Sequence, residues 1–220
     1  MHSSRAARFA LGIVPTLALL WLASRPSVPD GPPPPGTLRL GTVNLNAQNT
    51  RPEAATPALM AARIVPAPWR GPCAMSLVTA RLKIGDRRVG LIAAHTPPPA
   101  PACWSSRRPF LQGLARLVKD GRAVRSVGTA SQGLPLVVAG DLNSLGWEGP
   151  LRQLAWLGLT DAFDEGTWRL GPTWSPTRWL PAFLPIDDLW SPQDMPIRGA
   201  WTLHVPGSDH RAVIADLSAE

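Results

Sequence analysis

The stretch that decides the fold is residues 134–144, Leu-Pro-Leu-Val-Val-Ala-Gly-Asp-Leu-Asn-Ser. It opens with a continuous apolar run that stops at Gly140-Asp141, and this pattern predicts a strand buried on both faces of a sheet. Asp141 and Asn143 therefore stand where a buried strand ends. At that place a rigid sheet can hold polar side chains against a shared cleft. Taken alone, the Gly-Asp-Leu-Asn tetrapeptide also fits an Asx turn that leads into a helix.

The remaining sequence predicts several more strands and a few helices. The further strand candidates are apolar or alternating runs bounded by Pro, Gly or Ser, namely residues 37–45, 76–83, 88–94, 185–190, 200–205 and 212–217. The second and third of these flank Gly-Asp and predict a hairpin. Leucines at helical spacing predict an amphipathic helix over residues 110–119, and residues 149–157 also read as helical. Many strands with few helices indicate an α+β domain of packed sheets covered by helices.

Polar side chains recur where the predicted strands begin or end. They are Asn44, His95, Asp141, Asn143, Asp187, Asp209 and His210. Single members have ordinary explanations, because His95 precedes a run of prolines and fits a loop, and Ser208-Asp209-His210 fits a turn before the last strand. Their conjunction is harder to explain as unrelated caps and turns. We therefore expect these side chains to share one cleft.

In this order the motifs resemble those of the endonuclease/exonuclease/phosphatase family, metal-dependent enzymes with the deoxyribonuclease I-like fold. The resemblance runs from Leu38 to Leu217 and is carried by LRLGTVNLN, AAHTPPP, LPLVVAGDLNS, PTWSPT followed by PIDDLW, and GSDHRAVIADL. It implies an α+β fold, a four-layer α/β/β/α sandwich with two sheets face to face and helices outside. It also implies a hydrolase that cleaves phosphodiester bonds in a nucleic acid or a phospholipid head group.

The resemblance also assigns catalytic roles. Cleavage of a phosphodiester needs a positioned water, charge stabilisation on the phosphoryl oxygens and help for the leaving alkoxide. By the resemblance, Asp141 would orient or deprotonate the water and Asn143 would hold the phosphate. His210, kept in one tautomer by Asp187, would transfer a proton or contact the phosphate. His95 would lie near the leaving group, and either Asp141 or a histidine could be the base.

Further residues are implied in cation and substrate binding. Asp209 and Asp141 would bind Mg²⁺ or Mn²⁺, because carboxylate oxygens are the ligands that such hard cations prefer. Asn44 would line the same cleft as a substrate-binding residue. Arg178 belongs to the aromatic and proline-rich segment 168–184, where it could contact a phosphate.

The chain departs from the family pattern between its first strand and the hairpin. Family members have there a helix and a strand that ends in a metal-binding Glu, but Glu53 is the only carboxylate between Asn44 and Asp86. Its setting, Arg-Pro-Glu-Ala-Ala, fits the first turn of a helix instead. We therefore expect one or more strands to be missing near the amino-terminal half. Either the chain binds phosphate-bearing ligands without turnover, or the cation site is rebuilt from Asp209, Asp187 or Asp141.

The amino terminus predicts export. Arg5 and Arg8 precede an uncharged apolar run over residues 9–23, which is short for a membrane span and fits a signal peptide or a short membrane anchor. A buried core helix is the alternative. The expected organisation is a signal peptide or anchor at 1–24, a Pro-rich linker at 25–36 and an endonuclease/exonuclease/phosphatase-like domain at 37–220. Such a protein would be secreted, periplasmic or membrane-anchored, facing the outside of the cytoplasm.

The two cysteines bear on the same expectation. Cys73 and Cys103 are the only cysteines of the chain. Export would place them where a disulfide persists, although the sequence alone does not show whether their Cα atoms come close enough. A zinc site is disfavoured, because neither cysteine has a second Cys or His at ligand spacing.

Composition and charge narrow the function classes. The chain of 220 residues is 45% apolar and 17% charged, which excludes a disordered acidic tail, a collagen and a small disulfide knot. Lys and Arg number 22 against 15 Asp and Glu, and the net charge of +7 reflects either a compositional bias or an anionic ligand, which a basic surface attracts. The 10 tryptophans leave a structural or interaction protein with exposed Trp as a third hypothesis. Nothing in the sequence indicates an oligomeric state.

Overall fold

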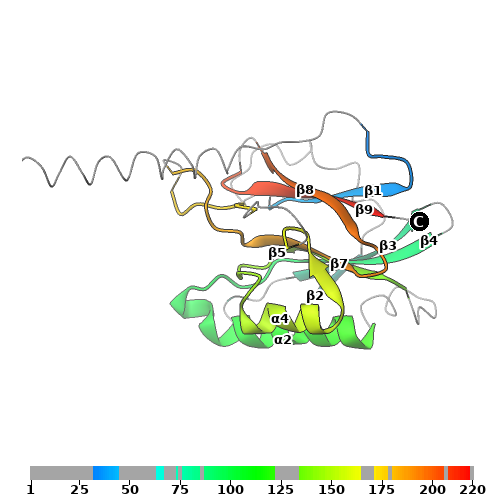
Figure 1. The fold of residues 1–220 in the computed structure, drawn as a ribbon. Helices are drawn as coiled ribbons and strands as arrows, with labels where there is room; N and C mark the ends of the chain where they lie inside the picture. The colour runs from blue at the N-terminus through cyan, green and yellow to red at the C-terminus, as the bar shows by residue number, and fades with distance from the viewer. Residues whose placement is uncertain are drawn as a thin grey trace, which may run out of the picture.

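The structure, a computed structural model, describes residues 32–44, 63–66, 73, 76–84, 87–121, 134–164, 171–177, 180–205 and 208–218. Two sheets lie face to face, and two helices cover the outer side of the larger sheet (Figure 1). The expected leader at 1–24, Glu53 and Arg178 lie outside the described residues. Within the part of the chain that is described, no helix combines the length and the apolarity needed to cross a bilayer.

The larger sheet has six strands in the order β2-β3-β4-β5-β7-β6. These strands are β2 (Arg63–Pro66), β3 (Ser76–Ile84), β4 (Arg87–Ala94), β5 (Leu136–Asp141), β7 (Asp187–Pro192) and β6 (Leu159–Asp161). All neighbours are antiparallel except β4 and β5, which run parallel. A parallel pair needs a crossover, and this one passes through the 3₁₀ turn η2 (Pro101–Cys103) and the helix α2 (Trp104–Asp120).

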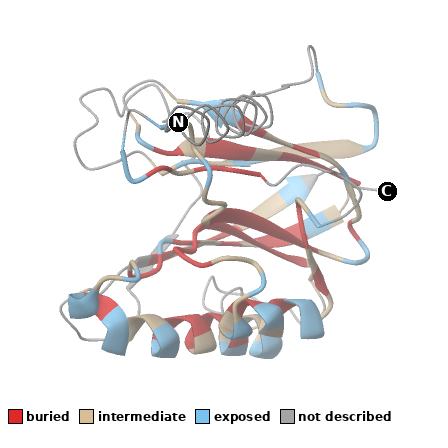
Figure 2. Cartoon of the chain, turned by 60° about the vertical axis from the view of Figure 1, so that its left-hand side comes forward, coloured by how far each residue is buried: buried red, intermediate tan, exposed pale blue. Residues whose placement is uncertain are grey.

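The smaller sheet has three strands in the order β1-β9-β8. They are β1 (Thr37–Thr42), β9 (Arg211–Ser218) and β8 (Ile197–His204), and both pairings are antiparallel. The second helix, α4 (Gly149–Trp156), lies beside α2 under the larger sheet. Figure 2 shows buried residues on the sheet side of these helices and exposed residues on their outer side, as expected for amphipathic helices that cover a sheet.

Strand β5 joins the two layers of the core. It is buried at every position, which confirms the predicted doubly buried strand. Val137 and Ala139 pack with Val213 and Ala215 of the smaller sheet. Val138 points to the other face, where it packs in the cluster formed with the helices, because successive side chains of a strand alternate between its two faces.

The observed elements confirm the α+β two-sheet sandwich and the β3–β4 hairpin. The helix predicted over 110–119 begins earlier, at Trp104, because Pro109 near its first turns does not interrupt it. The short strands β2 and β6 were not predicted, since each is too short to carry a clear period. The described residues place helices on only one sheet, and the second helix layer of the four-layer sandwich stays a prediction. Missing strands in the amino-terminal half stay a prediction.

A glycine is the next-to-last residue of the buried strand β5. Gly140 has a φ of 140°, a backbone conformation that side chains other than hydrogen rarely allow. A Cβ at this position would overlap the backbone oxygen of Ala94 at the end of β4. The Gly-Asp dipeptide therefore brings the ends of β4 and β5 into close approach, and this approach sets the positions of the polar residues that follow both strands.

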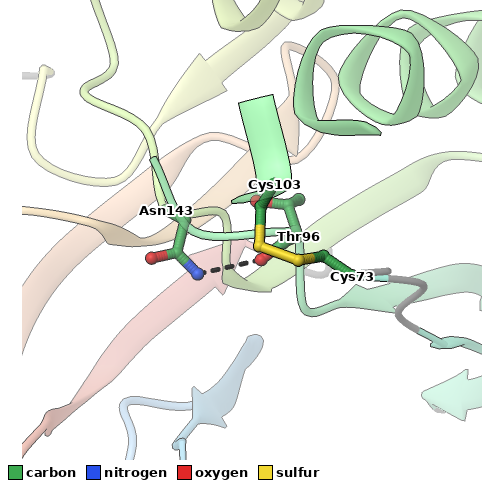
Figure 3. Close-up of a disulfide and its surroundings, with 4 residues drawn as sticks. All are labelled: Cys73, Thr96, Cys103 and Asn143. Atoms are coloured by element: carbon green, nitrogen blue, oxygen red, sulfur yellow. Dashed lines mark hydrogen bonds between the residues drawn. A yellow bond between two sulfur atoms is a disulfide. The ribbon is translucent and has the colours of Figure 1, made fainter. Parts of the chain in front are cut away.

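A disulfide joins Cys73 to Cys103, with a Cα–Cα distance of 5.4 Å. It ties the chain ahead of β3 to the turn η2, from which α2 starts. Figure 3 shows the disulfide beside Thr96 and Asn143. The sequence left this pairing open, and the structure shows that it is made.

Candidate active site

Five of the polar residues predicted from strand ends meet at one end of the two sheets. Asp141 is the last residue of β5, and it lies opposite Asp187, the first residue of β7, in the antiparallel register. The smaller sheet contributes His210, directly before β9, and Asn44, two residues after β1. His95 follows β4. Of the residues expected to share one cleft, Asn44, His95, Asp141, Asn143 and His210 line one hollow, and Asp187 lies against His210.

Asp141 lies between two adjoining hollows at this end. One has a volume of about 320 Å³ and is walled by Trp174 and His210, and the other has a volume of about 280 Å³. Asn44, His95 and Asp141 line both. A ligand in either hollow can thus reach the carboxylate.

Asp187 and His210 form a buried pair. The Nδ1 atom of His210 lies 2.7 Å from Oδ2 of Asp187, and both residues are buried. This contact assigns the proton to Nδ1 and turns Nε2 toward Asp141, 3.8 Å from its Oδ2. Burial lowers the pKa of His210, but the hydrogen bond to Asp187 and the charges of Asp187 and Asp141 outweigh it, so the pKa is raised overall.

The Asp141 carboxylate is held by three neighbours. The Nδ2 of Asn44 donates to its Oδ2 at 2.8 Å, and the backbone N–H of Asn143 donates to its Oδ1 at 3.0 Å. His95 places Nε2 at 3.4 Å from the same Oδ2. Burial and the nearby charge of Asp187 raise the pKa of Asp141 to about 7, although His210 and the hydrogen bonds oppose the rise. The carboxyl group can therefore exchange a proton near neutral pH.

His95 differs from His210 in its surroundings. Its side chain is half-exposed and has no carboxylate bonded to Nδ1 among the contacts described. Burial, followed by the charge of His210, lowers the pKa of His95. The pKa values of the two histidines are thus shifted in opposite directions, upward for His210 and downward for His95, which suits a division of roles between them.

Asn143 is fixed by its backbone and by Thr96. It has a positive φ of 47°, a conformation that Asn tolerates better than most residues. Its Nδ2 donates to the backbone oxygen of Thr96 at 2.9 Å (Figure 3), and the backbone N–H of Thr96 donates to the oxygen of Asp141 at 2.9 Å. These bonds join the ends of β4 and β5 into one rigid platform beneath the hollow.

Sequence reasoning missed Arg107, which supports this platform. From helix α2 its guanidinium donates to the backbone oxygen of Asn143 at 2.8 Å, to Oγ of Ser144 at 2.7 Å and to Oε2 of Glu148 at 2.7 Å. The other oxygen of Glu148 accepts from the N–H of Leu145. Arg107 stands four positions before Leu111, the first leucine of the predicted helix pattern, and its sequence setting carries no signal for this role.

Asp209 and Arg178 are not placed in the cluster. Asp209 is exposed, and its Oδ2 accepts from Nε1 of Trp174 at 3.4 Å. Arg178 lies outside the described residues. The predicted roles of Asp209 in metal binding and of Arg178 in substrate binding remain predictions.

The described residues offer one group that could hold a metal ion, Asp141, Asp187 and His210, whose ligand atoms lie within 4.8 Å of one another. The donor set fits a divalent cation. Asp187 Oδ1 is buried without a hydrogen-bond partner, and the raised pKa of Asp141 reflects two carboxylates that share a desolvated site. Because Nδ1 of His210 is bonded to Asp187, the two carboxylates are the oxygen donors that would bind a hard cation.

Comparisons with known proteins agree with this geometry. A sequence model described as the Endonuclease/Exonuclease/phosphatase family matches residues 30–210. No curated protein sequence matches the chain.

Several solved structures share the fold. Humanized D. rerio TDP2 with 14 mutations has 14% identity and a TM-score of 0.52, over 71% of this chain and 65% of that one. The human Nocturnin catalytic domain with bound sulfate anion has 16% identity and a TM-score of 0.52, over 84% of this chain and 81% of that one. D. rerio TDP2 complexed with a single strand DNA product has 13% identity and a TM-score of 0.54, over 98% of this chain and 94% of that one.

Proposed function

Because this chain belongs to the endonuclease/exonuclease/phosphatase family, we propose that it hydrolyses phosphodiester bonds with the help of a divalent cation. The observation that carries the proposal is the convergence of Asp141 with the Asp187–His210 pair and Asn44 in one hollow. The pKa of Asp141 is raised to about 7, and the pKa of the neighbouring His210 is raised by its hydrogen bond to Asp187 and by nearby carboxylates. Such perturbed pairs are typical of functional sites.

The residues divide the reaction among them. Asp141 takes the proton of the attacking water, for which a pKa near neutrality is suited. Asp187 holds His210 in one tautomer, so that its Nε2 faces the hollow and can donate to a phosphoryl oxygen. Asn44 orients the Asp141 carboxylate, and His95 stands on the same side for the leaving group. Mg²⁺ or Mn²⁺ bound by the two carboxylates would stabilise the charge of the phosphoryl oxygens.

A nucleic acid is the first substrate class to test, with a phospholipid head group as the second. The net charge of +7 supports an anionic substrate, and one structural neighbour is bound to a single strand DNA product. We also propose that the protein acts outside the cytoplasm and is secreted or anchored through residues 9–23. The Cys73–Cys103 disulfide supports this, because disulfides persist in oxidising compartments.

The test measures hydrolysis by the full chain of bis-p-nitrophenyl phosphate, single-stranded DNA and phosphatidylcholine vesicles, with Mg²⁺, with Mn²⁺ and with EDTA. We expect cation-dependent turnover that Asp141→Asn abolishes. Asp120→Asn, an exposed carboxylate at the end of α2, is the matched control and should keep activity. DNA binding without turnover under either metal would overturn the proposal and support a member that binds phosphates without cleaving them.

A further inference from the structure

A second hollow, of about 840 Å³, lies on the other face of the larger sheet. Asp187 and Leu189 of β7 point toward the smaller sheet, whereas Asp188 and Trp190 point toward the helices, because side chains alternate along a strand. Asp188 and Trp190 line the hollow, and Arg152 of α4 lines its opposite wall. The sheet therefore lies between the Asp188 side of this hollow and the candidate active site, and Leu184 lines both hollows.

Three carboxylates line this hollow, and none of them forms a described ion pair with a cation. Asp188 is 2% exposed, and its Oδ2 has no hydrogen-bond partner. Asp161 of β6 is buried, and its Oδ1 accepts from the N–H of Phe163 at 3.0 Å. Asp164 follows at the rim. Within the described part of the chain none of the three forms an ion pair, and the nearby guanidinium of Arg152 lies over Trp156 instead.

Aromatic side chains make up much of the remaining wall. Trp190 is buried, and its Nε1 has no hydrogen-bond partner. Trp147 and Phe183 line the same hollow and are 67% and 40% exposed, so they lie where a ligand from solvent would enter. Aromatic faces together with carboxylates attract organic cations, through the ring quadrupole and through direct charge pairing.

A bare metal ion does not suit this arrangement. Among the described residues, the only group of three or more residues with ligand atoms close enough to share one ion is Asp141, Asp187 and His210 on the other face. The acids of the second hollow are instead spread around a volume that exceeds a metal ion many times. A ligand that reaches them needs a carbon skeleton.

We propose that this second hollow binds an organic cation, an ammonium group carried on an apolar skeleton. The ammonium group pairs with Asp188 and Asp161 at the floor, and the skeleton packs against Trp147 and Phe183 at the entrance. This site is independent of the phosphodiesterase proposal. It gives the buried Asp188 oxygen a hydrogen-bond donor, since a buried polar group without a partner is costly.

The experiment is calorimetric titration of the full chain with three amines from different sources and with Ca²⁺. Choline represents a lipid head group, spermidine a free polyamine and Nα-acetyl-lysine amide a protein side chain. We expect at least one amine to bind, and Asp188→Asn to weaken it at least tenfold. Asp120→Asn removes an exposed carboxylate of α2 and should leave the affinity unchanged.

A second variant guards against a folding defect or a general charge effect. Gly146 lines the hollow, and a Cβ there would lie 3.0 Å from Oδ2 of Asp161. Gly146→Ala keeps every charge, and because it narrows the floor it should weaken amine binding severalfold. Thermal unfolding confirms that each variant is folded. The proposal is overturned if no amine binds the folded wild type, if Asp188→Asn and Gly146→Ala both bind as the wild type does, or if Ca²⁺ alone requires Asp188.

Discussion

Asp187 and Asp188 are consecutive residues of β7, yet their carboxylates lie in different environments on opposite faces of one sheet. Both are at least 98% buried. Asp187 meets the imidazole of His210 at 2.7 Å, and with it Asp141, Asn44 and the rest of the candidate active site. Asp188 has no such partner for its Oδ2.

The difference shows how a fold compensates buried acids. On the active-site face, the smaller sheet brings His210 and Asn44 to the carboxylates, so charge is balanced within the chain. On the helix face, α4 brings Arg152, but its guanidinium stacks on Trp156. Burial alone therefore does not define a catalytic carboxylate. The chemistry open to a buried carboxylate of the larger sheet depends on which side chains the neighbouring layer, the smaller sheet or the helices, brings against it.

The largest expected effect comes from removing the compensating histidine. His210→Ala should lower kcat by roughly three orders of magnitude, because proton transfer by a positioned group contributes about 10²–10⁴-fold. Steady-state hydrolysis of bis-p-nitrophenyl phosphate measures this. Retention of more than a tenth of wild-type kcat would remove His210 from the mechanism.

A smaller loss is expected when the orienting carboxylate is neutralised. Asp187→Asn removes the charge that holds the His210 proton on Nδ1, and kcat should fall by roughly 100-fold. It should also lower the pKa of His210, since the Asp187 hydrogen bond and charge raise it. NMR titration of the imidazole in metal-free protein reports this shift, and an unchanged or higher pKa would contradict the assigned contact.

The next effect concerns the platform under the active site. Arg107→Lys keeps the charge but cannot bridge Asn143, Ser144 and Glu148 at once, so kcat/KM should fall by about tenfold. Its exposed neighbour provides the control, because Arg108→Lys should have no effect. Equal activity in both variants would mean that the loop keeps its shape without the bridge.

The smallest effect is on stability, at the uncompensated acids. Burial is the main cause that raises the pKa of Asp161 to about 6 in the folded protein, against a hydrogen bond from Phe163. The folded state therefore binds this proton more tightly than the unfolded state, and stability is lost as pH rises through about 4 to 6. Asp161→Asn should add about 2 kcal/mol to the free energy of unfolding at about pH 8 and almost nothing at about pH 3.

Denaturant unfolding at both pH values measures the change. Asp161→Asn can keep the bond from the Phe163 N–H, because its side-chain oxygen still accepts. A gain of equal size at both values would assign the effect to packing and not to charge.

The residues of the candidate active site could be predicted from the sequence, whereas Arg107, which holds the loop beneath them, could not. Asp141, Asp187, His95, Asn44 and His210 each follow or precede an apolar strand, and that position alone indicated a common cleft. Arg107 reaches the site from the opposite layer, across a distance in sequence that no local pattern encodes. Asp188 is adjacent to Asp187 in the sequence, but strand alternation turns it to the other face of the sheet.

In the fold, too, the elements with a clear local pattern were predicted and those that depend on tertiary contacts were not. Period-two and continuous apolar runs predicted β1, β3, β4, β5, β7, β8 and β9, because each strand buries one face or both. The short strands β2 and β6 depend on pairing with a longer neighbour, which is a tertiary contact. The disulfide was open for the same reason, since only the folded chain brings its two Cα atoms within reach.

Gly140 has no side chain to take part in the chemistry, yet the backbone of Ala94 leaves no room for a side chain there. In a library of all single substitutions selected for activity, variants at Gly140 would therefore be lost as completely as variants at Asp141, its neighbour in the motif. Selection on Gly140-Asp141 combines two separate requirements: a chemical one at Asp141 and a steric one at Gly140. A protein that had lost its activity but kept its fold would retain the glycine and lose the aspartate, so the pair distinguishes inactive descendants from working enzymes by inspection.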